Sequence, residues 1–354
     1  MVDSVRIDEE QHLGARGGVA AWCEYAAMRL LLGGASRMPR FLQVRLVDVL
    51  ARIAAKIDKR HVDSARVFIG AALGEEAARD DERLVQAYRH IFQISLDAQA
   101  FERRVPQTSF LEHYDITYCE GFHEAVDAGR GGIAVTAHIG DWEAGSAIMP
   151  HVGLTPSYGV AKPPKNRYLS RHLLRVRERR RLTMVPRKGG MRAVASILEG
   201  GGWMGMLLDQ RPSGKAVVAN FFGRPARSER SAAVLIKRLR LPIIFVACYL
   251  TPRPFQYRLV FNRVIPPEEL AKLSVEQVVA LVNHEMEELI RVQPEQYFWL
   301  HDRYRDAPLD SPVPEVPEIP RMDPEAACDG SSGAESDSPS PEGRERPSQA
   351  NSGR

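Results

Sequence analysis

The sequence has few cysteines, no long uninterrupted apolar run and only a small net charge, +3. Its four cysteines, Cys23, Cys119, Cys248 and Cys328, are far apart and form no CxxC pair. This spacing argues against a disulfide framework or a zinc site and favours a reducing, cytoplasmic setting. None of them stands beside an obvious base, so we expect each to fill apolar space. Hydrophobic residues make up 44% of the chain, which is enough for a real core.

The N-terminal part contains no convincing signal peptide or membrane span. Residues 1–18 are polar and lack an apolar signal region. Residues 19–35 are apolar, but Glu24 and Arg29 interrupt them, and a spanning helix needs about 20 predominantly apolar residues. We predict either an amphipathic helix on a membrane surface or an ordinary helix packed on the core.

Hydrophobic periodicity divides the chain into a helical part and an α/β part. Apolar residues recur at spacings of three and four from Trp22 to Arg104, which predicts a helical region over residues 19–106. Short apolar runs then alternate with helical stretches, which predicts an α/β domain over residues 107–306. The expected strands cover residues 131–138, 201–209, 241–250 and 255–261. The expected helices cover residues 168–181, 191–199, 230–240 and 275–292.

Residues 307–354 differ in composition from the rest. They contain nine of the 24 prolines, ten acidic and four basic side chains, and no aromatic residue. Such a segment cannot bury enough apolar surface to offset the entropy lost on ordering. We predict a disordered acidic tail that begins at residue 307.

A possible acid–base pair follows the first predicted strand of the α/β part, in His138-Ile-Gly-Asp-Trp-Glu143. Across a strand–turn–helix junction, Gly140 would allow the turn, Asp141 would cap the helix and Glu143 would point back at the imidazole. A neutral histidine can take a proton from a hydroxyl while a carboxylate orients its ring. By itself the pattern more often marks a capped helix beside a hydrogen-bonded histidine.

A one-sided basic run follows this motif. Residues 162–192 include twelve Lys or Arg and one acidic residue. A spacing of four places Arg171, Arg175 and Arg179 on one face of a predicted helix. Such a surface attracts phosphate groups of a lipid headgroup, a phosphopantetheine carrier or a membrane. Nucleic acid is not expected, because no aromatic stacking platform accompanies the run.

A second predicted strand ends at Asp209. Ligands in α/β folds bind beyond the carboxyl ends of strands, which is where His138 and Asp209 both fall. Asp209 could hold an arginine or a polar group of the substrate, and Phe221 and Phe222 could line an apolar pocket. The simpler interpretation is a turn residue and two core aromatics.

In order and approximate spacing, several segments together resemble the lipid A biosynthesis acyltransferases, the late lauroyl and myristoyl transferases. The resemblance covers roughly residues 22–305 and rests on AHIGDWEAG, KPPKNRYLSRHLLRVRERR, PRKGGMRAV, LLDQ, FFGRPARSE and PEQYFWLHDRYR. It implies a glycerolipid-acyltransferase-like α/β fold, with a mixed central sheet flanked by helices after a helical N-terminal region. It also implies acyl-carrier protein as the donor, and peripheral or weak anchoring at the cytoplasmic face of the inner membrane.

The resemblance places the family's H-x4-D/E pair on His138 and Glu143, and its later aspartate on Asp209. Its supporting basic position falls best on Arg175, with the neighbouring Arg177 as the alternative. Two further candidates lie, by motif position, in the acceptor or phosphate region: Asn166 and Arg187.

The expected mechanism is direct attack by an acceptor hydroxyl on a thioester. His138 is the general base, Glu143 orients it, and no metal or dissociable cofactor is expected. The expected acceptor is an anionic glycolipid, a lipid A precursor. The alternatives are another glycolipid such as a phosphatidylinositol mannoside, hydrolysis of the thioester by the same pair, and a non-catalytic membrane-surface or carrier-binding module.

Overall fold

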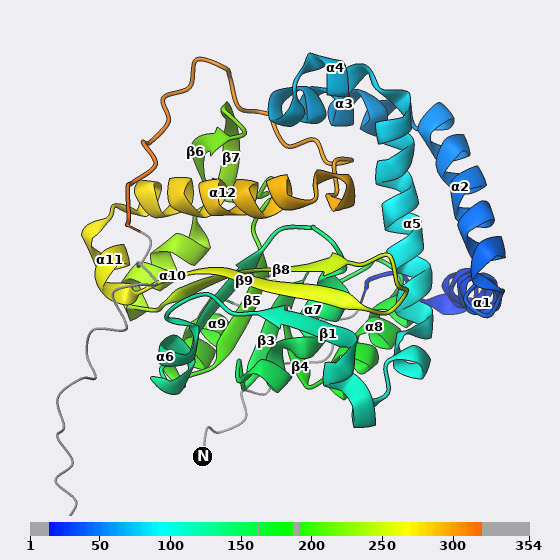
Figure 1. Ribbon diagram of the computed structural model, residues 1–354, viewed down its shortest axis with the longest axis horizontal. Coiled ribbons are helices and arrows are strands. Elements are labelled where there is room, and N and C mark those ends of the chain that lie inside the picture. The colour runs from blue at the N-terminus through cyan, green and yellow to red at the C-terminus, as the bar shows by residue number, and fades with distance from the viewer. Residues whose placement is uncertain (1–13, 162, 187–190, 321–354) are drawn as a thin grey trace, which may run out of the picture. The chain divides into compact units, whose positions relative to one another are not determined.

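Helices alone make up the first part of the protein in the computed structural model, which describes residues 14–161, 163–186 and 191–320 (Figure 1). The long α5 packs against α1, α2 and α3 and forms the centre of this layer. Its apolar stripe, which includes Leu84, Tyr88 and Ile94, is buried. The periodicity that predicted helices here is confirmed. The elements are α1 (Gly18–Ala35), α2 (Arg40–Ile57), α3 (Lys59–Leu73), α4 (Glu75–Arg79) and α5 (Asp81–Arg104).

A seven-stranded mixed sheet follows, with the order β1-β9-β8-β2-β5-β3-β4. Strands β8 and β9 pair antiparallel, and the other neighbours in this sheet pair parallel. A separate antiparallel hairpin is formed by β6 and β7. The strands are β1 (Tyr114–Thr117), β2 (Gly132–Thr136), β3 (Ser157–Ala161), β4 (Leu182–Pro186), β5 (Trp203–Leu207), β6 (Ala216–Phe221), β7 (Arg224–Glu229), β8 (Ile243–Leu250) and β9 (Tyr257–Ile265).

Helices cover both faces of the sheet, so that successive residues of each inner strand enter different clusters. Ile133 and Val135 of β2 pack into one cluster with residues of α9, α10 and α12. Ala134 packs into the other with residues of α7. The helices are α6 (Phe122–Asp127), α7 (Trp142–Ile148), α8 (Arg167–Arg179), α9 (Met191–Glu199), α10 (Ser231–Leu239), α11 (Pro267–Lys272) and α12 (Val275–Val292). Short 3-10 turns occupy Gln107–His113, Met149–Val152 and Pro294–Gln296.

The mixed α/β fold is as predicted, with four expected strands present as β2, β5, β8 and β9. The short β1, β3 and β4 and the β6–β7 hairpin were not predicted. The compact unit extends to Ile319, and residues 307–320 contain no helix or strand. Arg263 donates a hydrogen bond to the carbonyl of Ile319. The remainder of the predicted tail, 321–354, and residues 1–13 lie outside the described residues.

No helix among the described residues is both long and apolar enough to cross a membrane. The two charges that interrupt the apolar stretch of α1 face other parts of the protein. Glu24 pairs with Arg16 at 2.8 Å and accepts a hydrogen bond from Asn166. Arg29 contacts Gln99 of α5 and lies 3.1 Å from the Nε2 atom of His172 on α8.

Candidate active site

The register of two neighbouring parallel strands brings His138 and Asp209 together. Thr136, the last residue of β2, pairs with Leu207, the last residue of β5. Two residues further in the same register, His138 faces Asp209. Because both strands end at the same edge, the two side chains meet beyond the sheet, where ligands bind in this class of fold.

The carboxylate of Asp209 is fully engaged. Its Oδ1 accepts a hydrogen bond from the His138 Nδ1 at 2.8 Å, and its Oδ2 accepts from the His138 backbone amide at 3.0 Å and from the Tyr297 hydroxyl at 2.9 Å. Burial raises the pKa of Asp209, but the His138 charge and these hydrogen bonds outweigh it and lower the pKa to about 2. An ionised Asp209 only accepts, so the His138 Nδ1 carries a proton, and in the neutral form of the ring the Nε2 presents a lone pair. The amide of Gln210 lies 3.4 Å from that Nε2.

Glu143 does not make the contact with His138 that the sequence suggested. Its carboxylate receives two hydrogen bonds from Arg177 of α8, at 3.3 Å from Nε and 2.5 Å from Nη2. Burial raises the pKa of Glu143, yet the Arg177 charge and hydrogen bonds bring it below the ordinary value. The physical reason lies in the topology: Glu143 sits in the first turn of α7 and faces α8, whereas Asp209 follows the strand next to β2.

The turn between His138 and α7 is built as expected. Gly140 has a φ of +60°, and a Cβ there would lie 1.9 Å from the carbonyl oxygen of Cys248, so only glycine fits. Asp141 caps α7 by accepting a hydrogen bond from the Ala144 amide at 2.9 Å. The carbonyl of Gly140 accepts a hydrogen bond from the ring Nε2 of His90 on α5, at 3.0 Å. Burial lowers the pKa of His90 to about 4, so this link is made by a neutral ring.

A cavity of about 600 Å³ opens beside the His138 ring. Its polar lining includes His138, Glu143, Arg177 and Gln210. On the face of the sheet that carries His138, its lining is mainly apolar and includes Ala134, Ile148, Met149, Val152 and Leu154. The His138 side chain is 21% exposed and Asp209 only 1%, so the cavity reaches the imidazole but not the carboxylate behind it. The imidazole thus faces a largely apolar space whose wall also carries the cationic side chains of Arg177, Arg211 and Lys215.

Several residues that the sequence proposed for the site lie elsewhere. Arg175 is exposed and does not line the cavity, so Arg177 is the arginine of α8 that reaches it. Asn166 caps α8 through the amides of Tyr168 and Leu169 and donates to the carbonyl of Ala21. Its role is therefore to start α8 and hold it to α1. Arg187 lies outside the described residues.

The two phenylalanines suggested for a pocket belong to the core. Phe221 and Phe222 pack around Phe68, with ring centroids 5.9 and 6.3 Å away, and neither lines the cavity. Within the described chain, no set of three His, Cys, Asp or Glu side chains is arranged to hold a metal ion.

Sequence reasoning missed Tyr297 and His90, which support the site from distant segments. Tyr297 lies in the PEQYFW segment, where the backbone amide of Phe298 also donates to the His138 carbonyl at 3.0 Å. A buried tyrosine hydroxyl needs a polar partner, and that need is the signal that could have pointed to it. Nothing in the periodicity of α5 distinguishes His90 from a core residue.

A family comparison agrees with this geometry. The model of the bacterial lipid A biosynthesis acyltransferases matches residues 15–306, a range that holds the helical layer, the sheet and every residue of the site. No similar protein was found among curated sequences. Membership of one family therefore accounts for the ordered motifs, the mixed sheet and the histidine at a strand end. The chain belongs to the bacterial lipid A biosynthesis acyltransferase family and is an enzyme that transfers acyl groups.

Proposed function

We propose that the enzyme moves a fatty acyl chain from acyl-carrier protein to a hydroxyl of a lipid A precursor, with His138 as general base and Asp209 as the residue that orients it. The observation that carries this proposal is the His138–Asp209 hydrogen bond at the mouth of an apolar cavity. Asp209 fixes the proton on Nδ1, so Nε2 is the atom that takes the hydroxyl proton. The hydroxyl oxygen then attacks the thioester carbonyl, and the carrier thiol leaves as the carbon–sulfur bond breaks.

The imidazolium formed in this step is balanced by the ionised Asp209. It can return its proton to the leaving thiolate, so no net charge accumulates. Glu143 has a different role in this scheme from the one expected from the sequence: it holds Arg177 at the cavity wall. A guanidinium held in this way can bind an acceptor phosphate or stabilise the developing oxyanion.

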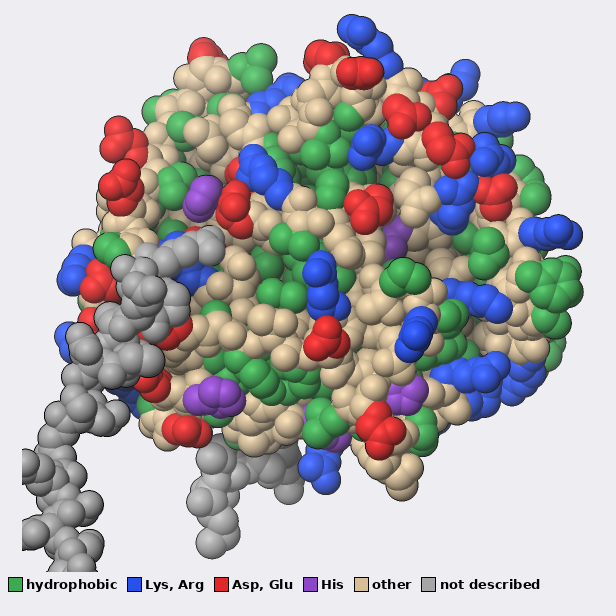
Figure 2. Space-filling model, viewed as in Figure 1, with side chains coloured by type: hydrophobic (Ala, Val, Ile, Leu, Met, Phe, Trp, Pro, Cys, Tyr) green, Lys and Arg blue, Asp and Glu red, His purple; other side chains and the backbone are tan. Residues whose placement is uncertain are grey.

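The proposed acceptor lies in a membrane, and the outer surface of α1 and α2 is suited to contact one. Ten of the sixteen exposed large hydrophobic side chains among the described residues lie on these two helices. Solvent-exposed apolar groups at this density mark an interaction surface. Figure 2 shows hydrophobic and basic side chains side by side along the edge that Figure 1 labels α1 and α2. The ten are Val19, Trp22, Leu30, Leu31, Phe41, Val44, Val49, Leu50, Ile53 and Ile57.

The charges around this surface fit an anionic bilayer. Residues 37–60 include seven Lys or Arg and only two acidic residues. Both acidic residues are engaged within the protein: Asp48 with Arg52 and Arg89, and Asp58 with His61. An apolar helix face flanked by an excess of basic side chains favours the interface of anionic lipids. These features support the proposal that the enzyme binds peripherally at the cytoplasmic face of the inner membrane.

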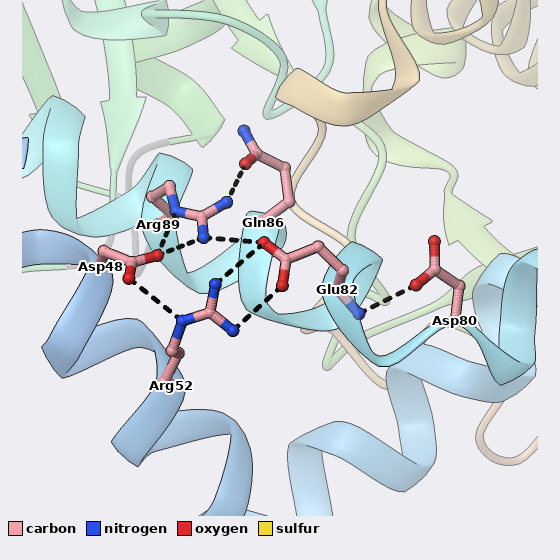
Figure 3. Close-up of polar contacts among 6 residues, drawn as sticks. All are labelled: Asp48, Arg52, Asp80, Glu82, Gln86 and Arg89. Carbon is pink, nitrogen blue, oxygen red and sulfur yellow. Dashed lines mark hydrogen bonds and ion pairs between the residues drawn. The ribbon is translucent and has the colours of Figure 1, made fainter.

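An ion network fixes which face of α2 points outward (Figure 3). Asp48 of α2 accepts from Arg89 of α5, and Arg89 pairs with Glu82 at 2.8 Å. Arg52 bridges back, with contacts of 3.0 Å to Asp48 and 3.1 Å to Glu82. With its polar side held to α5, α2 leaves Val49, Ile53 and Ile57 exposed.

The test is acyl transfer by purified full-length protein from a defined acyl-carrier-protein thioester to a lipid A precursor, with products read by mass spectrometry. The proposal expects one added acyl chain on the lipid, lost in His138→Ala. Thioester consumption that yields only free fatty acid would replace transfer with hydrolysis. Transfer by His138→Ala at the wild-type rate would overturn the assignment of the base.

A further inference from the structure

The cavity follows one face of strand β2 away from the base. His138, Thr136 and Ala134 alternate along the chain, face the same side of the sheet and all line the cavity. At about 3.3 Å per residue, Ala134 lies roughly 13 Å from His138 along the strand. The space beside His138 is therefore a channel that runs between the sheet and α7.

A glycine keeps this channel open beside Ala134. The partner of Ala134 on β5 is Gly205, which also lines the cavity. A Cβ at Gly205 would lie 3.1 Å from the sulfur of Met149 and 3.6 Å from the carbonyl oxygen of Tyr158. Met149 lines the cavity opposite the strand and is buried. Any side chain at position 205 must therefore displace Met149 or occupy channel volume.

The next pair along the strands is already filled. Gly132 pairs with Trp203, and a Cβ at Gly132 would lie 2.6 Å from the indole ring. Trp203 is buried, and neither residue lines the cavity. Along β2 and β5, the lining of the channel thus ends between the Ala134–Gly205 pair and the Gly132–Trp203 pair.

We infer that Gly205 and Met149 together set the longest acyl chain that the enzyme transfers. The chain runs from the thioester at His138 along β2 and β5, and its terminal methyl lies against the Met149 side chain. This inference rests on the proposed acyl transfer and adds the residues that determine chain-length specificity. A methionine suits such a position because its unbranched side chain fills an irregular gap without a fixed shape.

The experiment measures kcat/KM for a series of donors from decanoyl to palmitoyl thioesters. For each protein, kcat/KM for the longest donor that the wild type accepts is divided by kcat/KM for the shortest. Gly205→Val should reduce this quotient by about tenfold or more. Gly205→Ala should reduce the quotient by a smaller factor, since the flexible Met149 can move by a few tenths of an ångström. Met149→Ala should move the preference toward longer donors, and the double variant Gly205→Val/Met149→Ala should return toward the wild-type preference.

A matched control is Gly70→Ala in α3, where a new Cβ would meet Ala78 at an ordinary 3.4 Å and which does not line the cavity. Its chain-length ratios should equal those of the wild type. Unchanged ratios in both folded Gly205→Val and Met149→Ala would overturn the inference. If Gly205→Val fails to fold, the two Met149 variants test the inference. Met149→Ala should shift the preference toward longer donors and Met149→Phe toward shorter ones. Absence of transfer from every donor by the wild type would instead refute the proposed function.

Discussion

Asp209 holds His138 at two points: its Oδ1 accepts from the ring Nδ1 at 2.8 Å and its Oδ2 from the backbone amide of the same residue at 3.0 Å. One buried carboxylate therefore fixes both the position of the histidine backbone and the tautomer of its ring. The hydroxyl of Tyr297, from a segment far along the chain, donates a further hydrogen bond to the same carboxylate.

Asp209→Asn should reduce kcat strongly, on the order of 10⁴-fold if the loss resembles that in other histidine–carboxylate pairs, because an amide can favour the wrong tautomer. Steady-state kinetics with saturating donor measures this. Asp310→Asn, at an exposed position, is the control and should leave kcat unchanged. A variant of Asp209 that keeps more than a tenth of the wild-type kcat would contradict its role.

Arg177→Met should raise the KM for the glycolipid acceptor or reduce kcat, whereas Arg175→Met should change neither. Arg177 lines the cavity and Arg175 is exposed on the same helix. Because Arg177→Met leaves Glu143 without its partner, the comparison is repeated in a Glu143→Gln background. Equal kinetic losses for the two arginine variants would show that Arg177 has no specific role in the site.

Replacing Asp141 by Asn should remove a pH dependence of stability. Burial raises the pKa of Asp141 to about 6, above the ordinary value of 3.8. The folded state thus binds this proton more tightly than the unfolded state, and the wild type loses stability as pH rises from about 4 to 6.

Over that range the difference in unfolding free energy should move in favour of Asp141→Asn by an amount on the order of 3 kcal/mol. Urea unfolding at several pH values measures it. Asparagine is as good a helix cap as aspartate, so α7 should still form. A constant difference between the two proteins from pH 4 to 6 would show that Asp141 does not titrate in this way.

Ile53→Gln/Ile57→Gln should weaken binding to vesicles of phosphatidylethanolamine and phosphatidylglycerol by at least about tenfold, because two exposed apolar side chains no longer enter the interface. Co-sedimentation measures the bound fraction. Leu309→Gln is the matched control, since Leu309 is 69% exposed and belongs to neither α1 nor α2. Equal effects of the double variant and the control would exclude this surface.

Asn166→Ala should lower stability by about 1 kcal/mol through loss of the α8 cap. Its kinetic constants should stay close to the wild type at a temperature where the variant is folded. Thermal unfolding and steady-state assays separate the two effects. A selective rise in the KM for the acceptor without loss of stability would show that Asn166 contributes to substrate binding.

The sequence allowed the fold class and the position of His138 at a strand end to be predicted, because both depend on local patterns. Strands β2 and β5 are apolar runs that end in polar residues, and Gly140 and Asp141 are recognisable turn and capping residues. The partner of the base could not be predicted, because the choice between Glu143 and Asp209 depends on strand order. Only the adjacency of β2 and β5 brings Asp209 closest.

The sequence could not show which of Arg175 and Arg177 lines the cavity, for a related reason. Both lie in the same basic run, and helical periodicity alone does not say which side of α8 faces α7. Tyr297 and His90 were beyond reach of local patterns, since each contacts the site from a segment far away in the sequence. The missed strands β3 and β4 flank the basic segment, where charge obscures the apolar pattern.

The hydrogen bond from His90 to Gly140 has a consequence for where on a lipid the enzyme acts. Glu82 and Arg89 of α5 pair with Arg52 and Asp48 of α2, and His90 on the same helix donates to the turn that follows His138. One helix, α5, thus connects the surface proposed to contact the bilayer with the turn that follows the proposed base. An enzyme bound to the membrane through this surface would reach hydroxyls at one depth of the headgroup layer. The hydroxyl that is acylated would then depend on its distance from the acyl chains of the bilayer as well as on chemical recognition.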